Sequence, residues 1–296
     1  MPDFPALIRD RSRPLDPRPT DTPPRVEPLS DVRAVLFDVY GTLVISDSGD
    51  VGTHAAEDRS GAFVAALDAA GLPAADGKEG VAALKAVIAR RHAAAKAEGV
   101  DYPEVEIRAV WRDVFADLGA PTPDDARLER FAVEYECRTN PTWTMPHAAD
   151  VLRELRGRGA LLGIISNAQF FTPHLFPAHL GDTLEGFGFD PEARSWSYAH
   201  LRAKPGTFLY EYAAEKLAAR GIAPGQVLYV GNDLLNDCTP AQQVGFRTAL
   251  FAGDARSLRL REGDERVADT RPTVVVTDLR QLLESAPAVE TGSEAG

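Results

Sequence analysis

The chain has 296 residues, 44% of them hydrophobic, and carries a net charge of -12. This length and composition allow a sizeable apolar core in one large or two modest domains. The negative charge argues against general binding to nucleic acid or to anionic membranes, although a local basic patch would still allow a small anionic substrate as the partner.

Cysteine content and hydropathy point to the same cellular setting. The two cysteines, Cys137 and Cys238, are too few for a disulfide framework or a cysteine-based zinc site. No apolar run approaches the roughly 20 residues of a membrane span, and the first residues lack an apolar signal region. We therefore expect a cytoplasmic protein without a membrane partner. The sequence does not indicate an oligomeric state.

The two ends of the chain lack a sustained hydrophobic period. Residues 1–30 are rich in Pro, Arg and Asp, and residues 286–296 are small and acidic. Segments of this kind bury too little apolar surface to fold, so we predict a disordered tail at each end.

The first folded element is predicted at Val35–Phe37, a short apolar run typical of a buried parallel strand. Asp38 follows directly, at the strand end where open α/β sheets bind ligands. Gly41 permits an unusual backbone conformation, and Thr42 places a hydroxyl near whatever Asp38 binds. An aspartate that caps a turn or a helix is the alternative interpretation.

A long block of helical pattern follows, in which we expect no strand. The predicted helices are Gly61–Ala70, Glu79–Glu98, Val105–Leu118 and Asp125–Arg138. We interpret residues 46–145 as a helical insert. Basic residues of this insert are candidates for binding an anion, although a solvated helix face explains them as well: Arg90, Arg91, His92, Lys96, Arg108 and Arg112.

Strands and helices alternate again beyond the insert. The predicted helices are Asp150–Gly157 and Thr207–Arg220, and the predicted strands are Leu161–Asn167, Val227–Gly231, Arg247–Phe251 and Thr273–Thr277. Repeated βα units give mostly parallel strands, so at least five strands share one carboxyl edge. The expected fold class is α/β, with a Rossmann-like parallel sheet core formed by residues 31–45 and 146–285.

Chemically active side chains converge on that edge of the sheet. Asp38 supplies a candidate nucleophile, Ser166 a hydroxyl beside amides able to hold an anion, and Lys204 a positive charge. Asp233 and Asp237 add two carboxylates. Each residue also has a structural explanation, as a helix cap or a surface lysine. Clustered carboxylates repel, so a cation is needed, and Lys204 and Mg²⁺ are the candidates.

Four segments occur in the order FDVYGTL, IISN, AKPG and VGNDLLND. Together they resemble the four motifs of the haloacid dehalogenase-like (HAD) hydrolase superfamily, subfamily I, with the insert at the place of a helical type 1 cap. The resemblance covers about Asp31 to Ala286. It implies that Asp38 is a nucleophile whose covalent aspartyl intermediate is hydrolysed by water. It also implies a cap that closes over the substrate and sets its specificity.

The resemblance assigns roles to the other motif residues. The implied catalytic residues are Asp38, Tyr40, Thr42, Ser166, Asn167 and Lys204. The implied substrate-binding residues are Thr42, Ser166, Asn167 and Lys204. The implied Mg²⁺ ligands are the carboxylates of Asp38, Asp233 and Asp237 and the main-chain carbonyl of Tyr40.

The residue two positions after the nucleophile departs from the phosphatase pattern. Phosphatases of the superfamily usually carry an aspartate there as general acid and base, and this chain has Tyr40. A phenol with a reference pKa of about 10 is a poor base near neutral pH. General acid–base catalysis contributes on the order of 10²–10⁴-fold. Asp47, Asp50 and His54 are candidates to replace the missing aspartate.

Tyrosine at this position is instead the pattern of the 2-haloacid dehalogenases, whose halide leaving group needs no proton and which work without metal. Tyr210, six residues past Lys204, also matches a tyrosine of that subfamily. The substrate-binding arginine of the dehalogenases is missing at the expected spacing, and Arg59 is the nearest candidate.

The fourth motif fits neither branch. The common metal-binding form has an aspartate directly after glycine, where this chain has Asn232 followed by Asp233. The dehalogenase form Ser-x-Asn-x-x-Asp is also absent, because Leu234 stands three residues before Asp237. Asp237 is the firmer expected ligand, and Asp233 is expected to bind directly or through water.

We therefore expect a Mg²⁺-dependent hydrolase of a small phosphorylated metabolite, working through an aspartyl-phosphate intermediate. Metal-independent hydrolysis of a 2-haloacid is the alternative. A third hypothesis is a weakly active or inactive domain that keeps the fold and binds a phosphorylated ligand or a partner protein. The sequence does not identify the substrate.

Overall fold

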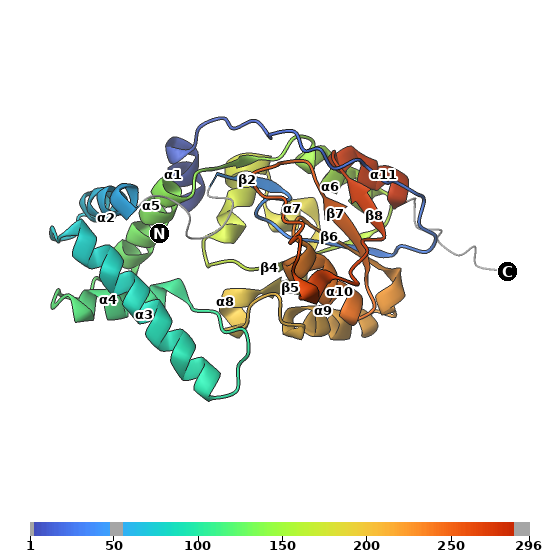
Figure 1. Ribbon diagram of the computed structural model, residues 1–296. Coiled ribbons are helices and arrows are strands. Elements are labelled where there is room, and N and C mark those ends of the chain that lie inside the picture. Colours follow the sequence, from blue (N-terminus) through green and yellow to red (C-terminus); the bar gives the residue numbers. More distant parts are fainter. Residues whose placement is uncertain (1–2, 48–55, 287–296) are drawn as a thin grey trace.

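The computed structural model describes residues 3–47 and 56–286 and contains one six-stranded sheet (Figure 1). The strands lie in the order β5-β4-β1-β6-β7-β8, and every neighbouring pair is parallel. Their bounds are β1 (Ala34–Phe37), β4 (Leu161–Ser166), β5 (Phe189–Trp196), β6 (Val227–Gly231), β7 (Arg247–Phe251) and β8 (Val274–Val276). The predicted α/β class is confirmed.

Both faces of the sheet are covered by helices. Val35 and Phe37 of β1 pack in one apolar cluster with α6 (Ala148–Gly157) and α11 (Leu282–Ser285). Their neighbours Ala34 and Leu36 pack in another with α9 (Phe208–Ala218) and α10 (Thr239–Gln243). Burial on two faces explains why these strands are continuous apolar runs in the sequence. Shorter elements complete the core: η1 (Thr172–His174), η2 (Phe176–Leu180), α7 (Leu184–Phe187), α8 (Ser197–His200), η3 (Pro224–Gln226), η4 (Leu234–Cys238), η5 (Glu265–Val267) and η6 (Leu279–Gln281).

Three strands were not predicted. β5 pairs with β4 alone and carries exposed polar residues such as Glu192, so it lacks the apolar run of a central strand. β2 (Val44–Ser46) and β3 (Thr142–Thr144) pair in antiparallel register at the two ends of the insert. The expectation of no strand between Ile45 and Met145 was therefore wrong, because strands of three residues are too short for a periodic signal.

The insert contains the four predicted helices, which are α2 (Ala56–Ala69), α3 (Gly77–Ala97), α4 (Ile107–Asp117) and α5 (Asp125–Thr139). They pack around an apolar cluster of their own. Trp111 and Phe131 lie at its centre with ring centroids 4.8 Å apart in an edge-on arrangement that aromatic rings favour. No helix in the described ranges is long and apolar enough to cross a membrane.

The amino-terminal segment differs from prediction. Residues 3–30 are not a free tail, because helix α1 (Phe4–Arg11) buries Phe4 and Ile8, four residues apart, between the insert and the core. Arg11 Nε lies 2.9 Å from Glu134 Oε2 on α5. The chain then runs along the core (Figure 1), where Arg25 forms a β-bridge with Val275 of β8. Two buried apolar residues in a short polar helix give no clear period. Residues 287–296 of the second predicted tail lie outside the described residues.

The packing of α1 predicts a cost for truncating Ile8, which is 1% exposed. Ile8→Ala leaves a cavity between the insert and the core and lowers the free energy of unfolding by about 2–5 kcal/mol, measured by urea denaturation. Asp10→Ala, at an exposed position of the same helix, is the control and changes this value by less than about 0.5 kcal/mol. An Ile8→Ala protein as stable as the parent would contradict the burial of α1.

Stability also depends on pH through His179, whose Nε2 lies 2.9 Å from the Thr142 hydroxyl of β3. Burial, with a smaller contribution from Arg9, lowers the pKa of His179 from 6.5 to about 4. The folded state therefore resists protonation that the unfolded chain accepts, and stability present above pH 6.5 is lost as the pH falls toward 4. Urea denaturation at pH 7.5 and 4.5 is expected to show a loss of about 2 kcal/mol that His179→Asn removes.

Candidate active site

Three neighbouring strands deliver the predicted catalytic residues to one edge of the sheet. Asp38 follows β1, Asn167 follows β4, and Asp237 lies in η4 after β6. Because β4, β1 and β6 are adjacent and parallel, their carboxyl ends meet. The loop after Asp38 turns sharply at Gly41, where φ is 79° and an added Cβ would lie 2.5 Å from Ser257 Cβ, so only glycine fits.

Lys204 contacts both Asp38, at the end of β1, and Asp237, in the fourth motif. Its Nζ lies 3.0 Å from Asp38 Oδ1 and 2.6 Å from Asp237 Oδ1, and the lysine side chain is 3% exposed. Burial by itself lowers the pKa of Lys204, but the charges of Asp237 and Asp38 outweigh it and raise that pKa above its usual value. Lys204 therefore stays an ammonium group at neutral pH.

Asn167 fixes the main chain that carries this lysine. The Lys204 amide donates to Asn167 Oδ1 at 2.9 Å, and Asn167 Nδ2 donates to the Lys204 carbonyl at 3.3 Å. The side-chain amide of Asn167 thus binds the loop around Lys204. It still lines the cavity described below.

Asp237 has a full set of partners. Its Oδ1 lies 3.0 Å from the Tyr229 hydroxyl as well as near Lys204, and its Oδ2 accepts the amides of Asn232 and Asp233, both at 2.9 Å. Burial raises the pKa of Asp237 to about 6, although the charge of Lys204 opposes the rise. Asp237 therefore shapes the loop of the fourth motif and anchors Lys204.

Asp233 also holds other groups. Its Oδ1 accepts the amides of Leu235 at 2.9 Å and Asn236 at 3.2 Å, which caps η4. Arg261 binds both carboxylate oxygens through Nε and Nη2. A bidentate arginine and two amides satisfy the carboxylate, so the structural explanation of Asp233 as a cap applies.

The predicted Mg²⁺ ligands fit the ion only in part. Asp233 and Asp237 are engaged as described, and among the residues of the ranges 3–47 and 56–286 no group of three or more His, Cys, Asp or Glu side chains is placed to hold a metal. Mg²⁺ usually keeps several waters and takes one or two carboxylates plus substrate phosphate. The carboxylate of Asp38 and the main-chain carbonyl of Tyr40 are compatible with that reduced set.

Tyr40 does not supply the missing acid–base group. Its hydroxyl lies 3.0 Å from Thr172 Oγ1, and burial, with the nearby charge of Glu136, raises the pKa of Tyr40 well above its usual value. Asp47 lies 3.7 Å from Arg256 and is not part of the cavity lining. Asp50 and His54 lie outside the described residues.

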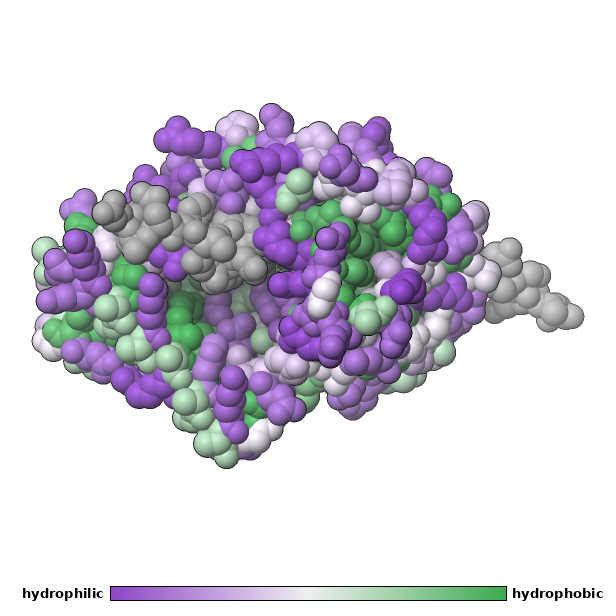
Figure 2. All heavy atoms as spheres, viewed as in Figure 1, coloured by the Kyte–Doolittle hydropathy of each residue, from purple (hydrophilic) through white to green (hydrophobic). Residues whose placement is uncertain are grey.

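A cavity of about 510 Å³ lies where the core meets the insert, and Figure 2 shows the surface hollowed between the two. Predicted site residues that line it are Asp38, Tyr40, Asn167, Lys204, Asn232, Asp233 and Asp237. Thr42 and Ser166 are fully buried and are not among the lining residues. The Thr42 hydroxyl donates to Asn232 Oδ1 at 3.1 Å, and Ser166 Oγ lies 3.4 Å from the Asn167 carbonyl.

Several lining or supporting residues were not predicted from the sequence. Glu104, Glu136 and Gln169 line the cavity, and nothing in their local sequence distinguishes them from ordinary polar surface residues. Tyr229 lies within a strand that is otherwise apolar, and its hydroxyl reaches Lys204 and Asp237. A polar group inside a buried strand is the one sequence signal that pointed to Tyr229.

The basic candidates of the insert pair with acids of the insert itself. Their contacts are Arg90 with Asp117, Arg91 with Asp113, Arg108 with Glu106 and Glu129, and Arg112 with Asp125. Lys96 is exposed. His92 is the one candidate of this group that lines the cavity.

Tyr210, which matches a tyrosine of the dehalogenases, and Arg59, the nearest candidate for their arginine, lie apart from the cavity lining. Tyr210 packs its ring against Tyr229 at 5.0 Å and donates from its hydroxyl to the Asn236 carbonyl at 2.8 Å. Burial raises the pKa of Tyr135 and of Glu136, and the nearby charge of Arg59 opposes the rise in each. The buried Nε of Arg59 has no hydrogen-bond partner in the part of the chain that the structure describes.

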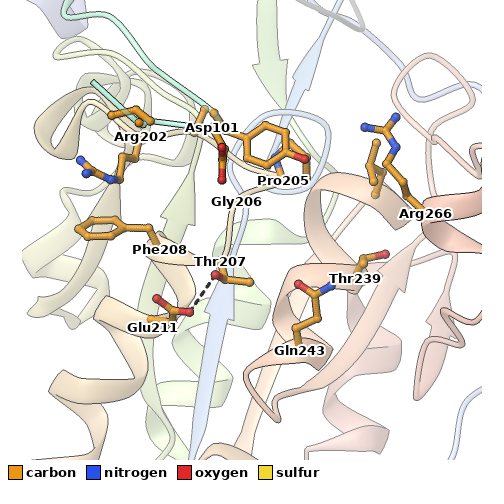
Figure 3. A pocket seen from close by; sticks show the side chains of 15 residues that line it. Asp101, Arg202, Pro205, Gly206, Thr207, Phe208, Glu211, Thr239, Gln243 and Arg266 are labelled. Atoms are coloured by element: carbon orange, nitrogen blue, oxygen red, sulfur yellow. Dashed lines mark hydrogen bonds between the residues drawn. The ribbon is translucent and has the colours of Figure 1, made fainter. Parts of the chain in front are cut away.

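A second cavity of about 500 Å³ lies beside the loop after Lys204 (Figure 3). Its walls come from Asp101 of the insert, from Arg202, Phe208 and Glu211 near α9, and from Arg266. Arg202 stacks over the Phe208 ring at 4.8 Å. None of the predicted catalytic residues lines this cavity, so the candidate catalytic cavity is the one above Asp38.

The protein thus combines a parallel α/β sheet with an aspartate–lysine pair at the carboxyl edge of that sheet. The chain belongs to the haloacid dehalogenase-like hydrolase family, whose model matches residues 32–245. The family predicted from the four motifs is thereby confirmed. Mg²⁺ is a common cofactor in this family. A comparison with curated proteins gives no match.

Solved structures of both branches are similar to this chain. A HAD phosphatase from Thermococcus onnurineus is 20% identical, with 87% of this chain and 100% of that chain covered and a TM-score of 0.51. A 2-haloacid dehalogenase from Pseudomonas syringae pv. Tomato DC3000 is 21% identical, with 86% and 97% covered and a TM-score of 0.55. At such identities the similarity shows the fold alone.

The contacts of Asp237 predict its effect on stability. Asp237→Asn removes the negative charge closest to Lys204 and lowers the free energy of unfolding by about 3 kcal/mol, because the buried ammonium loses a partner. Thermal and urea denaturation measure this change. Asp269→Asn, at an exposed position, is the matched control. Equal stability of the two variants would mean that Asp237 does not anchor Lys204.

Proposed function

We propose that this chain hydrolyses small phosphate monoesters with Asp38 as the nucleophile. The observation that carries the proposal is the contact of Lys204 with Asp38 and Asp237 at a cavity of about 510 Å³. This volume lies within the range of sites for metabolites and exceeds the needs of a haloacid of three carbons. The carboxylates of Glu104 and Glu136 in the lining also disfavour a substrate that carries a carboxylate of its own.

In the first step, an Asp38 carboxylate oxygen attacks phosphorus and the bond from phosphorus to the ester oxygen breaks. The leaving oxygen keeps the electron pair of that bond and takes a proton from water. Lys204 orients Asp38 and offsets the charge that develops on the phosphoryl oxygens. Mg²⁺, held by the Asp38 carboxylate and the Tyr40 carbonyl, would supply further charge neutralisation.

In the second step, water attacks phosphorus of the aspartyl phosphate. The bond between phosphorus and the Asp38 oxygen breaks, phosphate leaves, and the proton of the attacking water passes to solvent. Thr42 and Ser166 do not line the cavity and support its lining residues from within the core. Thr42 does so by holding Asn232 in place. The insert forms the outer wall and excludes water as a cap does. The free thiols of Cys137 and Cys238 support a cytoplasmic setting for the reaction.

Tyr40 favours a second candidate, the hydrolysis of a carbon–halogen bond in a 2-haloacid. Its hydroxyl is bound to Thr172 and has a raised pKa, so it is a poor base for water at neutral pH. A halide leaves without a proton, and this reaction needs no acid at position 40. The family match is compatible with both reactions.

Turnover of an aryl phosphate and of 2-chloropropionate, each with Mg²⁺ and with a chelator, separates the two candidates. The proposal predicts phosphate release that requires Mg²⁺ and falls by at least about 10³-fold in Asp38→Asn, because the nucleophile is lost. Released phosphate and halide are measured directly.

Asp47→Asn, which changes an aspartate outside the cavity lining, is the matched control and keeps parental turnover. Phosphate release that survives Asp38→Asn would contradict the aspartyl mechanism. Halide release in the presence of chelator would favour the second candidate. Absence of both products would leave a domain that binds without turnover.

A further inference from the structure

The wall of the catalytic cavity opposite Asp38 carries acidic groups from the insert. Glu104 lies between α3 and α4, and Glu136 lies on α5. Both line the cavity with Asp38 and Lys204. Burial raises the pKa of both glutamates, which indicates that the protein alone solvates their charges poorly.

Glu104 is the less compensated of the two. Its Oε1 accepts the Val105 amide at 2.8 Å, and its Oε2 accepts the Ser197 hydroxyl at 2.9 Å. Both donors are neutral, and among the described residues no lysine, arginine or histidine forms a salt bridge with Glu104. Glu136, in contrast, lies within electrostatic reach of Arg59. A buried carboxylate without a cation is costly unless a ligand brings one.

The position of Glu104 is fixed relative to the reacting groups. Its amide donates to the Leu201 carbonyl at 3.2 Å, and the Ala203 amide donates to the Tyr102 carbonyl at 2.8 Å. A β-bridge between Pro103 and Arg202 lies between these bonds. Asp101, three residues before Glu104, and Arg202 appear together in the wall of the second cavity (Figure 3). Lys204 follows directly on this loop.

Ser197 links Glu104 to the strand end that carries Asn167. The Ser197 hydroxyl donates to Glu104 Oε2 and accepts the Ala168 amide at 2.9 Å. The carboxylate therefore cannot swing toward solvent without breaking its hydrogen bond to Ser197, a residue that is itself fully buried. A carboxylate that is held in place binds a cation at lower entropic cost than a mobile one.

A second polar group of the insert lies at this wall. His92 lines the cavity, and its buried Nε2 has no hydrogen-bond partner in the described ranges. Burial and the charge of Lys96 lower the pKa of His92, so the ring is neutral and does not serve as the cation for Glu104. A ligand with hydrogen-bonding groups would satisfy both side chains.

We propose that the substrate of this site is a phosphate monoester whose leaving group carries a protonated amine, and that Glu104 binds that ammonium group. This inference rests on the proposed function, since the phosphoryl end lies at Asp38 and Lys204. It names the substrate class, a zwitterionic phosphate ester of an amino alcohol or amino sugar. Glu104 is a specificity residue that contacts the substrate away from the reacting atoms.

Binding to Asp38→Asn protein separates recognition from turnover. Calorimetry with 2-aminoethyl phosphate and with 2-hydroxyethyl phosphate compares an ammonium group with a hydroxyl of similar size. We expect the ammonium ester to bind at least about tenfold more tightly, because a charge-assisted hydrogen bond to a buried carboxylate replaces a neutral one. Equal affinities would overturn the inference.

Glu104→Gln in the same background keeps the size of the side chain and removes its charge. The preference for the ammonium ester is expected to fall to about onefold, whereas Glu98→Gln, at an exposed position six residues earlier, keeps it. A preference that survives Glu104→Gln would assign the recognition to another group and overturn the inference. The melting temperature of each variant reports folding, and Glu104→Asp is expected to restore part of the preference if Glu104→Gln does not fold.

Kinetics with the unmutated protein test the ammonium recognition and the phosphatase activity separately. The ratio of kcat/KM for the two esters is expected to favour 2-aminoethyl phosphate by about tenfold or more, mainly through KM. Equal kcat/KM values with measurable phosphate release would overturn only the ammonium inference. Absence of binding and of release for both esters and for an aryl phosphate would overturn the proposed function itself.

Discussion

The contact of one ammonium group with two carboxylates is the interaction on which the site depends. Asp38 and Asp237 follow different strands, and without a cation their charges repel each other at the sheet edge. Lys204 lies between them with its side chain 3% exposed. Its own loop is held by Asn167 after a third strand. Contacts of Lys204 and its loop thereby connect the ends of β1, β4 and β6. These contacts fix the orientation of Asp38 before any substrate binds.

The same constraint changes the role of the fourth motif. Two of its acids resemble metal ligands in the sequence, yet Asp237 binds two backbone amides and Lys204, and Asp233 binds Arg261 and caps η4. Both carboxylates are therefore occupied by contacts that stabilise the loop of the fourth motif. Asp38 remains the carboxylate at which an incoming phosphoryl group and a cation can meet, because it lines the cavity and Lys204 is the one ion-pair partner of its side chain among the described residues.

Three connections hold the insert against the core and so define the cavity above Asp38. β2 and β3 pair where the chain enters and leaves the insert, and α1 packs across both parts with Arg11 bound to Glu134. On the other side, Pro103 forms a β-bridge with Arg202. These contacts place polar residues of the insert opposite the nucleophile. The acidic wall formed by Glu104 and Glu136 therefore results from how the insert is joined to the core. In our proposal this wall favours a substrate that carries a positive charge.

The sequence by itself determined the class of fold and most of its core. Apolar runs bounded by turn residues located β1, β4 and β6, helical periods located α2 to α5, and the motif residues after those strands were placed correctly at one edge, because local patterns carry this information. Tertiary structure alone decided that Phe4 and Ile8 belong to the core, that Tyr229 supports Lys204 and that Glu104 faces the cavity. Each of these facts depends on contacts between segments distant in sequence, for which a single sequence contains no periodic signal. The contacts of Asp38 have the same origin, because tertiary packing and not spacing along the chain decides which cation a carboxylate contacts.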